Sequence, residues 1–268
     1  MEVVFNDVSF SYDNNKVFDK FSCCLSSGII NAVIGATGTG KSTMLDLIDG
    51  LIECDNGYIK IGSYKNNSIR RSIGYLFQFP EDQIFNSNVY TEIEFGLKCF
   101  KCDDIDSKIR ESIKLVGLDE SYLSLNPYKL SNGERRKVAF ASILAYDPDI
   151  LILDEPTVGL DNKSKSDLIK LLRVLKKDYG KTIIIVSHDM NFLLKFVDYV
   201  YLLRNGSIFL EGDKYSVLSN EDAMTECGLC VPNILCFSNL VLKKKNIKIG
   251  YRDEINDLIK DVYRYAKW

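Results

Sequence analysis

The sequence predicts an α/β fold in which a parallel sheet is covered by helices. Short runs rich in Ile, Val and Leu alternate with segments of helical periodicity, the pattern of successive strand–helix units. Most of these runs are apolar at every position, as expected of strands that are buried on both faces of a sheet. The strands expected from them span residues 30–34, 73–77, 150–153, 183–186 and 199–203.

Helices are expected after several of these strands, at residues 41–49, 107–116, 133–145, 164–177 and 190–196. Residues from about 80 to 145 are helical in pattern and contain no clear buried strand, so they predict a helical subdomain inserted into the sheet domain. The opening stretch, residues 2–12, instead alternates apolar and polar side chains, and residues 206–210 form a short terminal strand. Both are expected in an antiparallel layer.

Composition restricts the class of protein. The 268 residues are 46% hydrophobic and 26% charged, as in an ordinary globular protein. Lys and Arg total 34 against 37 Asp and Glu, a net charge of -3 that does not suit a nucleic-acid binder. No apolar run approaches the roughly 18 residues of a membrane span, and no signal-peptide pattern is visible. We therefore expect a cytoplasmic protein that reaches a membrane only through another chain.

The eight cysteines include two pairs with C-x-x-C spacing, Cys99 with Cys102 and Cys227 with Cys230. Two such pairs can form a four-thiolate zinc site when about 15–20 residues separate them. These pairs lie much further apart in the chain. We therefore expect reduced structural thiols rather than a zinc or redox site.

Residues 35–43 carry the most specific motif in the chain, which fits G-x-x-x-x-G-K-[ST]. The motif directly follows an apolar strand and opens a helix, as a phosphate-binding loop does. Its glycines let successive N–H groups point at one centre, and the helix N-terminus adds positive potential. We expect Lys41 to contact the β- and γ-phosphates and Ser42 to ligate Mg²⁺. The predicted nucleotide-binding residues are Gly35, Ala36, Thr37, Gly38, Thr39, Gly40, Lys41, Ser42 and Thr43.

Two carboxylates follow the buried run at 150–153. Asp154 fits the second contact to Mg²⁺, and Glu155 fits the base for an attacking water. His188 is the only histidine and follows the strand at 183–186. The carboxyl end of a strand is where an open α/β sheet presents its ligand, so a donor there can touch the γ-phosphate and sense whether it is present.

These motifs, in this order, resemble the ATP-binding subunit of an ATP-binding-cassette (ABC) transporter over roughly residues 3–225. The resemblance identifies residues 35–43 as the Walker A loop, 150–155 as Walker B and 187–189 as the histidine switch. It implies a P-loop NTPase (ABC ATPase) core with an antiparallel β edge layer, a helical subdomain insertion and a small C-terminal region. ATP and Mg²⁺ are the cofactors that it implies.

The same resemblance assigns three further single residues. Tyr12 is similar to the aromatic residue that stacks on adenine. Gln78 is similar to the Q-loop glutamine, which helps to hold Mg-ATP and take it through hydrolysis. Asp161, in the run Gly-Leu-Asp at 159–161, is similar to the D-loop aspartate.

Residues 130–134, Leu-Ser-Asn-Gly-Glu, resemble the signature motif L-S-G-G-Q. In the family this motif closes on the ATP of a second subunit, which implies that Ser131 and Gly133 act on the partner's nucleotide. Asn132 replaces the first Gly and tolerates left-handed backbone. Glu134 replaces the Gln and brings negative charge toward a γ-phosphate unless it points away. A weaker composite site in a mixed pair of ATPases is one expectation, and a homodimer is the other.

Charged residues next to this motif and after Gln78 have two interpretations. Arg135 and Arg136 are expected to be solvated helix charges. Residues 76–85, 91–96 and 227–232 are similar to the energy-coupling-factor (ECF) subgroup, which serves vitamin and nickel or cobalt uptake. The subgroup implies that Glu81, Asp82 and Gln83 line a groove for the membrane partner's coupling helices, where acids suit basic residues. The alternative is a polar helix start whose acids favour the helix dipole.

Residues 226–268 are expected to form a C-terminal dimerisation region after an ATP-binding domain at 1–225. The last helix carries an apolar stripe, Ile255, Leu258, Ile259 and Val262, that fits packing on its own domain or a dimer contact. The resemblance favours the dimer.

The function implied is an ATPase that powers uptake of a vitamin or transition-metal ion at the cytoplasmic face of the cell membrane. The partners implied are a second ABC ATPase, a transmembrane coupling subunit and a substrate-binding membrane subunit. The alternatives are an ABC ATPase of iron-sulfur cluster assembly and the ATPase of another type of ABC transporter.

Overall fold

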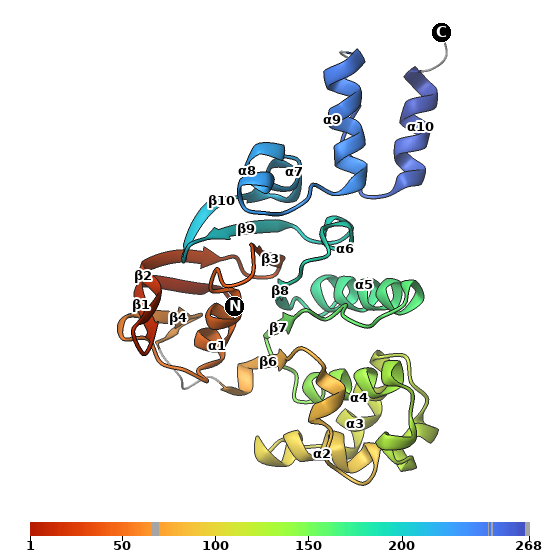
Figure 1. Cartoon of the computed structure of the whole chain (residues 1–268). Helices are drawn as coiled ribbons and strands as arrows, with labels where there is room; N and C mark the ends of the chain where they lie inside the picture. Colours follow the sequence, from red (N-terminus) through yellow and green to blue (C-terminus); the bar gives the residue numbers. More distant parts are fainter. Residues whose placement is uncertain (66–69, 246, 248, 266–268) are drawn as a thin grey trace.

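The computed structural model describes residues 1–65, 70–245, 247 and 249–265 of the chain (Figure 1). These residues contain a six-stranded sheet of order β10-β9-β3-β8-β7-β6 and a four-stranded sheet of order β2-β1-β4-β5. The strands are β1 (Val3–Tyr12), β2 (Asn15–Leu25), β3 (Ile30–Ile34), β4 (Asn56–Ile61), β5 (Tyr64–Lys65), β6 (Ile73–Leu76), β7 (Ile150–Asp154), β8 (Thr182–Val186), β9 (Tyr199–Arg204) and β10 (Ser207–Asp213).

The helices alternate with these strands along much of the chain, so the α/β fold class is confirmed. They are α1 (Lys41–Asp49), α2 (Val89–Cys99), α3 (Ile105–Leu115), α4 (Asn132–Leu144), α5 (Asn162–Lys177), α6 (Met190–Leu194), α7 (Lys214–Leu218), α8 (Glu221–Glu226), α9 (Asn233–Lys245) and α10 (Ile255–Tyr265). Within the described ranges, no helix is both long and apolar enough to cross a membrane.

The five expected buried strands are all present and run parallel to one another as β9, β3, β8, β7 and β6. Their side chains alternate between two hydrophobic clusters, one on each face of the sheet. Ile150 and Ile152 lie in the cluster that includes the four-stranded sheet and α1, whereas Leu151 and Leu153 lie in the cluster with α4 and α5. Burial on both faces explains why these runs are apolar at every position.

The terminal strand β10 belongs to a different sheet from the one predicted. It was expected in the antiparallel layer with the opening strand, but it pairs antiparallel with β9 at the edge of the six-stranded sheet. The reason is the two-residue turn Asn205–Gly206, in which both residues have positive φ, 49° and 71°. Such a turn is typical of a tight hairpin, and it places β10 directly beside β9.

The four-stranded sheet contains strands that the sequence did not reveal. Besides β1, it holds β2 and β4, which both pair antiparallel with β1. The pairing of β1 with β2 shifts register after Phe5, Val8 and Phe10. These irregularities interrupt the alternation of buried and exposed side chains, so period-two patterning is weak in β2.

Between β6 and β7 the chain forms helices alone, among them α2, α3 and α4 (Figure 1). This helical part packs through buried residues of all three helices, including Ile93, Ile109 and Val138. The N-terminus of α4, where the signature-like residues lie, is turned toward the start of α5 rather than into this packed interior.

The C-terminal residues attach to the sheet domain through α7. The Lys214 ammonium and the Tyr215 hydroxyl both donate to the Asp253 carboxylate, each at 2.6 Å. On α10, Leu258 is buried, but Ile255 and Ile259 are 58% and 43% exposed. The apolar stripe of the last helix therefore packs on its own chain through Leu258 and, in part, Val262, and it leaves Ile255 and Ile259 uncovered.

Candidate nucleotide-binding site

The loop at residues 35–43 joins β3 to α1 and has the backbone of a phosphate-binding loop. Gly35 and Gly40 have φ of 156° and 101°, and Gly40 is the residue that caps α1. A Cβ atom at Gly35 would lie 2.6 Å from the Leu203 carbonyl oxygen, and one at Gly40 would lie 2.9 Å from the Phe18 ring. Glycine is therefore required at both positions by backbone conformation and by space.

The Lys41 side chain folds back over this loop. Its ammonium donates to the Gly35 and Ala36 carbonyl oxygens at 2.9 and 2.8 Å. Burial lowers the pKa of Lys41, and the nearby carboxylates Glu155 and Asp154 act against that shift. A desolvated point charge held over converging N–H groups is suited to an anionic phosphate chain.

Ser42, in the first turn of α1, is hydrogen-bonded to Asp154, at the end of β7. The Ser42 hydroxyl donates to Asp154 Oδ2 at 3.2 Å, although 112 residues separate them in the chain. Burial raises the pKa of Asp154, while Ser42 and the Lys41 charge partly offset it. The negative charge of Asp154 is only partly balanced by its neighbours. The hydroxyl and the carboxylate together offer two oxygen ligands that fit Mg²⁺. Gln78 is exposed just past β6, the strand next to β7.

Glu155 leaves the end of β7 in a left-handed conformation, with φ of 46°. Its N–H donates to the Val186 carbonyl oxygen at 2.9 Å, which ties it to the neighbouring strand β8. Its carboxylate accepts the His188 N–H at 3.3 Å, and Oε1 lies 3.5 Å from His188 Nε2. Burial raises the pKa of Glu155, and Oε1 has no hydrogen-bond donor within the described part of the chain. The geometry suits a general base.

The two raised carboxyl pKa values predict a pH-dependent cost to stability. Between their unfolded pKa, about 4, and the raised folded pKa, the folded chain binds more protons than the unfolded chain. Their contribution is full below the unfolded pKa and is lost as pH rises through the folded pKa. Asp154→Asn, which removes one buried charge, is therefore expected to raise the ligand-free melting temperature near pH 7 by about 2–4 °C.

Thermal melts at acidic and neutral pH check this expectation, and the gain should shrink as pH falls toward about 4. Asp103→Asn is a matched control, because Asp103 is exposed. A lower melting temperature for Asp154→Asn than for wild type near neutral pH would contradict the electrostatic account.

The signature-like residues form a capped helix start. Ser131 is the N-cap of α4, and its hydroxyl accepts the Glu134 N–H at 3.3 Å. The Ser131 N–H and hydroxyl donate to Glu134 Oε2 at 2.9 and 2.7 Å, which completes a capping box. The Tyr122 hydroxyl donates to Glu134 Oε1 at 2.7 Å, and the hydrogen bonds from Tyr122 and Ser131 lower the pKa of Glu134. Glu134 is therefore an ionised cap.

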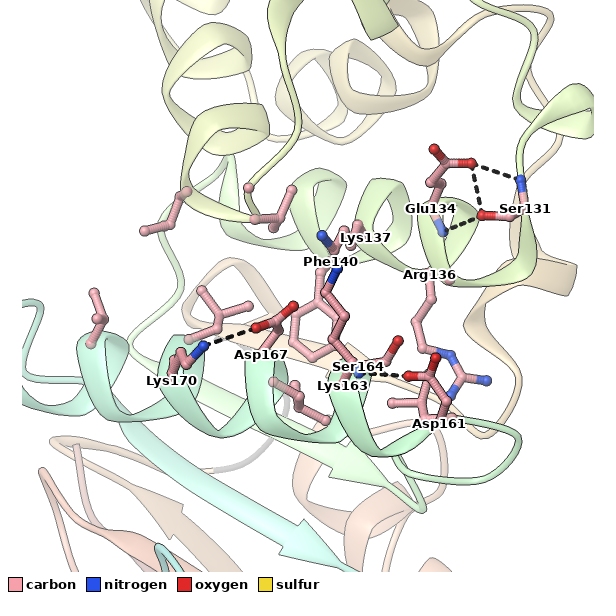
Figure 2. A pocket seen from close by; sticks show the side chains of 18 of the residues that line it. Ser131, Glu134, Arg136, Lys137, Phe140, Asp161, Lys163, Ser164, Asp167 and Lys170 are labelled. Carbon is pink, nitrogen blue, oxygen red and sulfur yellow. Dashed lines mark hydrogen bonds and ion pairs between the residues drawn. The ribbon is translucent and has the colours of Figure 1, made fainter.

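A cavity of about 750 Å³ separates α4 from α5. Ser131, Gly133 and Glu134 line it from α4, and Asp161 and Ser164 line it from the start of α5 (Figure 2). Asp161 caps α5 by accepting the Ser164 N–H at 2.7 Å, a hydrogen bond that lowers the pKa of Asp161. The structure thus brings the signature-like and D-loop-like residues together, and no described residue of the 35–43 loop lines this cavity.

Three further sequence-predicted residues make contacts with near neighbours in the chain. Tyr12 ends β1, is 46% exposed and packs edge-on against Phe10. Asn132 is the first residue of α4, and its side-chain oxygen accepts from Arg135. Thr39 closes the phosphate loop by donating to the Ala36 carbonyl oxygen at 2.9 Å.

The expectation that Arg136 is solvated was wrong, because Arg136 is 5% exposed. Glu81 lies in the first turn of the 3₁₀ helix Pro80–Gln83, as the helix-start alternative expected, but it is only 8% exposed. The two side chains bond to each other. The reason is that α4 packs against the short 3₁₀ helix Pro80–Gln83, so that both side chains are covered.

A second contact near the site was also missed. Lys165 on α5 bonds to Asp189, the residue after His188, at 2.7 Å. No local pattern could have revealed these pairs, because sequence shows residue type and not the partner across the fold. Among the eight cysteines, Cys102 and Cys227 are buried, whereas Cys99 and Cys230 are exposed.

A glycine loop that opens a helix, an acid pair at the end of a nearby parallel strand and a helical insertion together define a phosphate-loop nucleotide-binding protein. Residues 18–158 match the family model described as ABC transporter. The chain belongs to the ABC transporter family.

Relatives extend this match over nearly the whole chain. The energy-coupling factor transporter ATP-binding protein EcfA2 of Bacillus cereus is 35% identical over 265 aligned positions, which cover 93% of this chain and 90% of the relative. The corresponding EcfA3 of Oenococcus oeni is 36% identical over 286 aligned positions, which cover 100% and 99%.

Solved structures show the same fold. The structure of cbiO1 from Clostridium perfringens, part of the ABC transporter complex cbiONQ, has a TM-score of 0.76 at 29% identity and covers 88% of this chain and 98% of its own. The ATP-binding cassette MJ0796, dimeric and bound to ADP and Pi, has a TM-score of 0.69 at 27% identity and covers 79% and 98%.

Proposed function

We propose that this chain is the ATP-binding and ATP-hydrolysing subunit of an ECF-type importer, which couples hydrolysis to uptake of a vitamin or transition-metal ion through separate membrane subunits. The observation that carries this proposal is the match along nearly the full chain to relatives named EcfA2 and EcfA3. The contacts of Lys41, Ser42, Asp154 and Glu155 supply the chemistry that an ATPase needs. A role in iron-sulfur cluster assembly does not account for this match.

Each residue at the carboxyl edge of the sheet has a defined task in this mechanism. Lys41 binds the β- and γ-phosphates, and Ser42, Asp154 and Gln78 hold the magnesium ion of Mg-ATP. The ion, when bound, neutralises charge on the phosphates. Glu155 orients the attacking water and accepts its proton, which a raised pKa favours near neutral pH. His188, 49% exposed beside Glu155, donates to the γ-phosphate.

A second ATPase completes the site. Ser131, Gly133 and Glu134 line a cavity away from the phosphate loop of their own chain, and Asn132 stands between Ser131 and Gly133 in the sequence. We therefore assign them to the ATP of the partner subunit, with Asp161 in the same interface. The uncovered apolar residues of the C-terminal region support a dimer contact by residues 226–268 next to the ATP-binding domain at 1–225. They are Phe237, Leu240, Leu242, Ile255, Ile259 and Tyr263.

The membrane subunit is expected to dock beside the helical part, which holds the chain peripherally at the cytoplasmic face. Phe85 and Phe95 are 59% and 50% exposed, and their rings pack edge to face with centroids 4.9 Å apart. Tyr128 is 59% exposed and fixes the backbone before Phe85 by donating to the Ile84 carbonyl oxygen at 2.7 Å. We call Phe85, Phe95 and Tyr128 the aromatic patch. A patch of this kind suits an apolar helix of the coupling subunit.

A mild-detergent pull-down of the tagged chain from its own cells tests this function. We expect a polytopic membrane protein and a second cassette ATPase, with a small membrane subunit that identifies the substrate. The double variant Phe85→Ser/Phe95→Ser should recover about tenfold less membrane protein, because exposed aromatic anchors dominate interface energy. It should retain the second ATPase.

Tyr179→Ser provides the matched control, since Tyr179 is a 53% exposed aromatic residue just after the C-terminal end of α5. Recovery of soluble iron-sulfur assembly proteins alone would overturn the transporter function and leave the ATPase chemistry standing. Equal membrane-protein recovery from the double variant would remove the aromatic patch from the docking surface.

A further inference from the structure

Arg136 is a buried charge with a full set of partners. Its guanidinium donates to both carboxylate oxygens of Glu81, from Nε at 3.1 Å and from Nη2 at 2.9 Å. Its Nη1 donates to the carbonyl oxygens of Pro156 and Val158, at 3.1 and 2.8 Å. Only a planar guanidinium can make a two-pronged carboxylate contact and reach two backbone carbonyls at the same time.

These partners come from segments with different tasks. Glu81 lies in the 3₁₀ helix Pro80–Gln83, between Gln78 and the aromatic patch. Pro156 and Val158 lie between Glu155 and Asp161, and Figure 2 shows the Arg136 side chain extending from α4 toward this segment. Arg136 itself is in α4, which begins at the Ser131 cap. One guanidinium on the signature-like helix thus bonds both to the docking side and to the backbone that follows Glu155.

Stability alone gives a weak reason for this arrangement. A buried ion pair is often no more stabilising than apolar residues of similar size, whereas removal of one partner is costly. Burial opposes ionisation of Glu81, but the hydrogen bonds from Arg136 and the backbone outweigh it and lower the pKa of Glu81. Both groups therefore stay charged, and each requires the other in place.

The segment held by Arg136 also needs restraint. Glu155 has a left-handed backbone, which is unfavourable for a residue with a side chain. Its conformation is fixed by its N–H bond to Val186 and by the turn bond from the Val158 N–H to the Glu155 carbonyl oxygen at 3.3 Å. Arg136 binds the other end of that turn. A shift of Arg136 therefore moves the turn that sets the direction of the Glu155 carboxylate.

We propose that Arg136 is a positioning residue that transmits docking of the membrane subunit, through Glu81, to the turn carrying Glu155 and thus to the rate of ATP hydrolysis. The proposal rests on the proposed function for the identity of the membrane partner and of the base. It assigns Arg136 no contact with ATP. Its effect is on kcat and on how kcat responds to the partner, rather than on KM for ATP.

The test compares wild type, Arg136→Lys, Glu81→Gln and the double variant. Each is assayed as the isolated chain and as the purified membrane complex. The deciding readout is the ratio of kcat in the complex to kcat of the isolated chain. Both kcat values are expressed per mole of ATP-binding sites, so that a smaller folded fraction of the isolated chain does not by itself move this ratio. Arg136→Lys keeps the positive charge but removes the planar guanidinium that makes the two-pronged contact. Glu81→Gln keeps the shape of the side chain but removes its negative charge.

We expect Arg136→Lys to lower kcat of the isolated chain about tenfold, with KM changed less than about twofold. In both single variants the ratio of the two kcat values should be closer to one than the wild-type ratio, by about threefold or more. The double variant should lose no more kcat than Arg136→Lys alone, because the effects of coupled residues are not additive. Arg173→Lys is the matched control, since Arg173 donates to the Lys195 carbonyl oxygen at 2.7 Å away from the site. Its ratio should equal that of wild type.

The outcomes separate this inference from the function beneath it. If both single variants keep the kcat ratio of the wild-type complex, the proposed role of Arg136 is overturned while the transporter function stands. Additive losses in the double variant overturn it as well. Failure of wild type to recover any membrane protein overturns the proposed function and the inference together. If Arg136→Lys does not fold, the ratio measured for Glu81→Gln decides.

Discussion

Glu155→Gln is expected to lower kcat for ATP hydrolysis by about 10²–10⁴-fold while leaving ATP binding intact. The amide has the size of the carboxylate and can still accept the His188 N–H, so the end of β7 should keep its shape. It cannot take a proton from water. Because the proposed site is complete only when the partner's signature-like residues contact the ATP, the variant should also accumulate as an ATP-bound dimer.

Phosphate release, equilibrium ATP binding and size-exclusion chromatography with ATP check these three results. Glu120→Gln is the matched control, because Glu120 pairs with Lys114 at 2.6 Å on the surface. Unchanged turnover in Glu155→Gln would remove Glu155 from the role of base. Lost ATP binding would instead assign the residue to the nucleotide pocket.

Lys41→Ala is expected to weaken ATP binding about 10²-fold or more. A hydrogen bond to a charged group contributes about 1.5–3 kcal/mol, and the ammonium can donate to more than one phosphate oxygen. The ligand-free structure already holds this ammonium over the loop through the Gly35 and Ala36 carbonyl oxygens. The bound geometry therefore requires a change of hydrogen-bond acceptor and little movement of the lysine.

Calorimetric titration with Mg-ATP measures this effect. Lys16→Ala is the control, because Lys16 is an exposed lysine that pairs with Asp19 at 3.0 Å on β2. An affinity within about threefold of wild type would show that the loop N–H groups, rather than the lysine charge, carry most of the binding.

Sequence predicted the parts of this molecule that depend on near neighbours in the chain. The five buried strands were visible because burial on both faces leaves every position apolar. The phosphate loop was visible because its glycine spacing, strand and helix are contiguous. The antiparallel strands were harder, since the register shifts between β1 and β2 spoil the alternation on which such a prediction relies. β10 was assigned to the wrong layer although its Asn205–Gly206 turn indicated a hairpin with β9.

The candidate site divides in the same way. Asp154 and Ser42 could be assigned to one predicted magnesium site because each stands next to an unmistakable strand or loop. The contact between Arg136 and Glu81 was not predicted, because 55 residues separate them and neither has a neighbour that indicates burial. A charged residue looks the same in sequence whether water or an opposite charge surrounds it. Only the packing of α4 against the 3₁₀ helix Pro80–Gln83 decides the matter.

The cap at the start of α4 has a consequence for dimer closure. The Glu134 carboxylate occupies the Ser131 N–H and hydroxyl, the donors that the proposed function assigns to the partner's ATP. A phosphate arriving from the other chain must therefore displace an anion that is already bound there. Closure becomes a competition between two anions for one helix end, and the Tyr122 hydroxyl gives the displaced carboxylate a place to remain. Under the proposed function, Glu134 in place of the Gln of L-S-G-G-Q is thus a competitor, tethered to the same chain, for the site of the partner's phosphate.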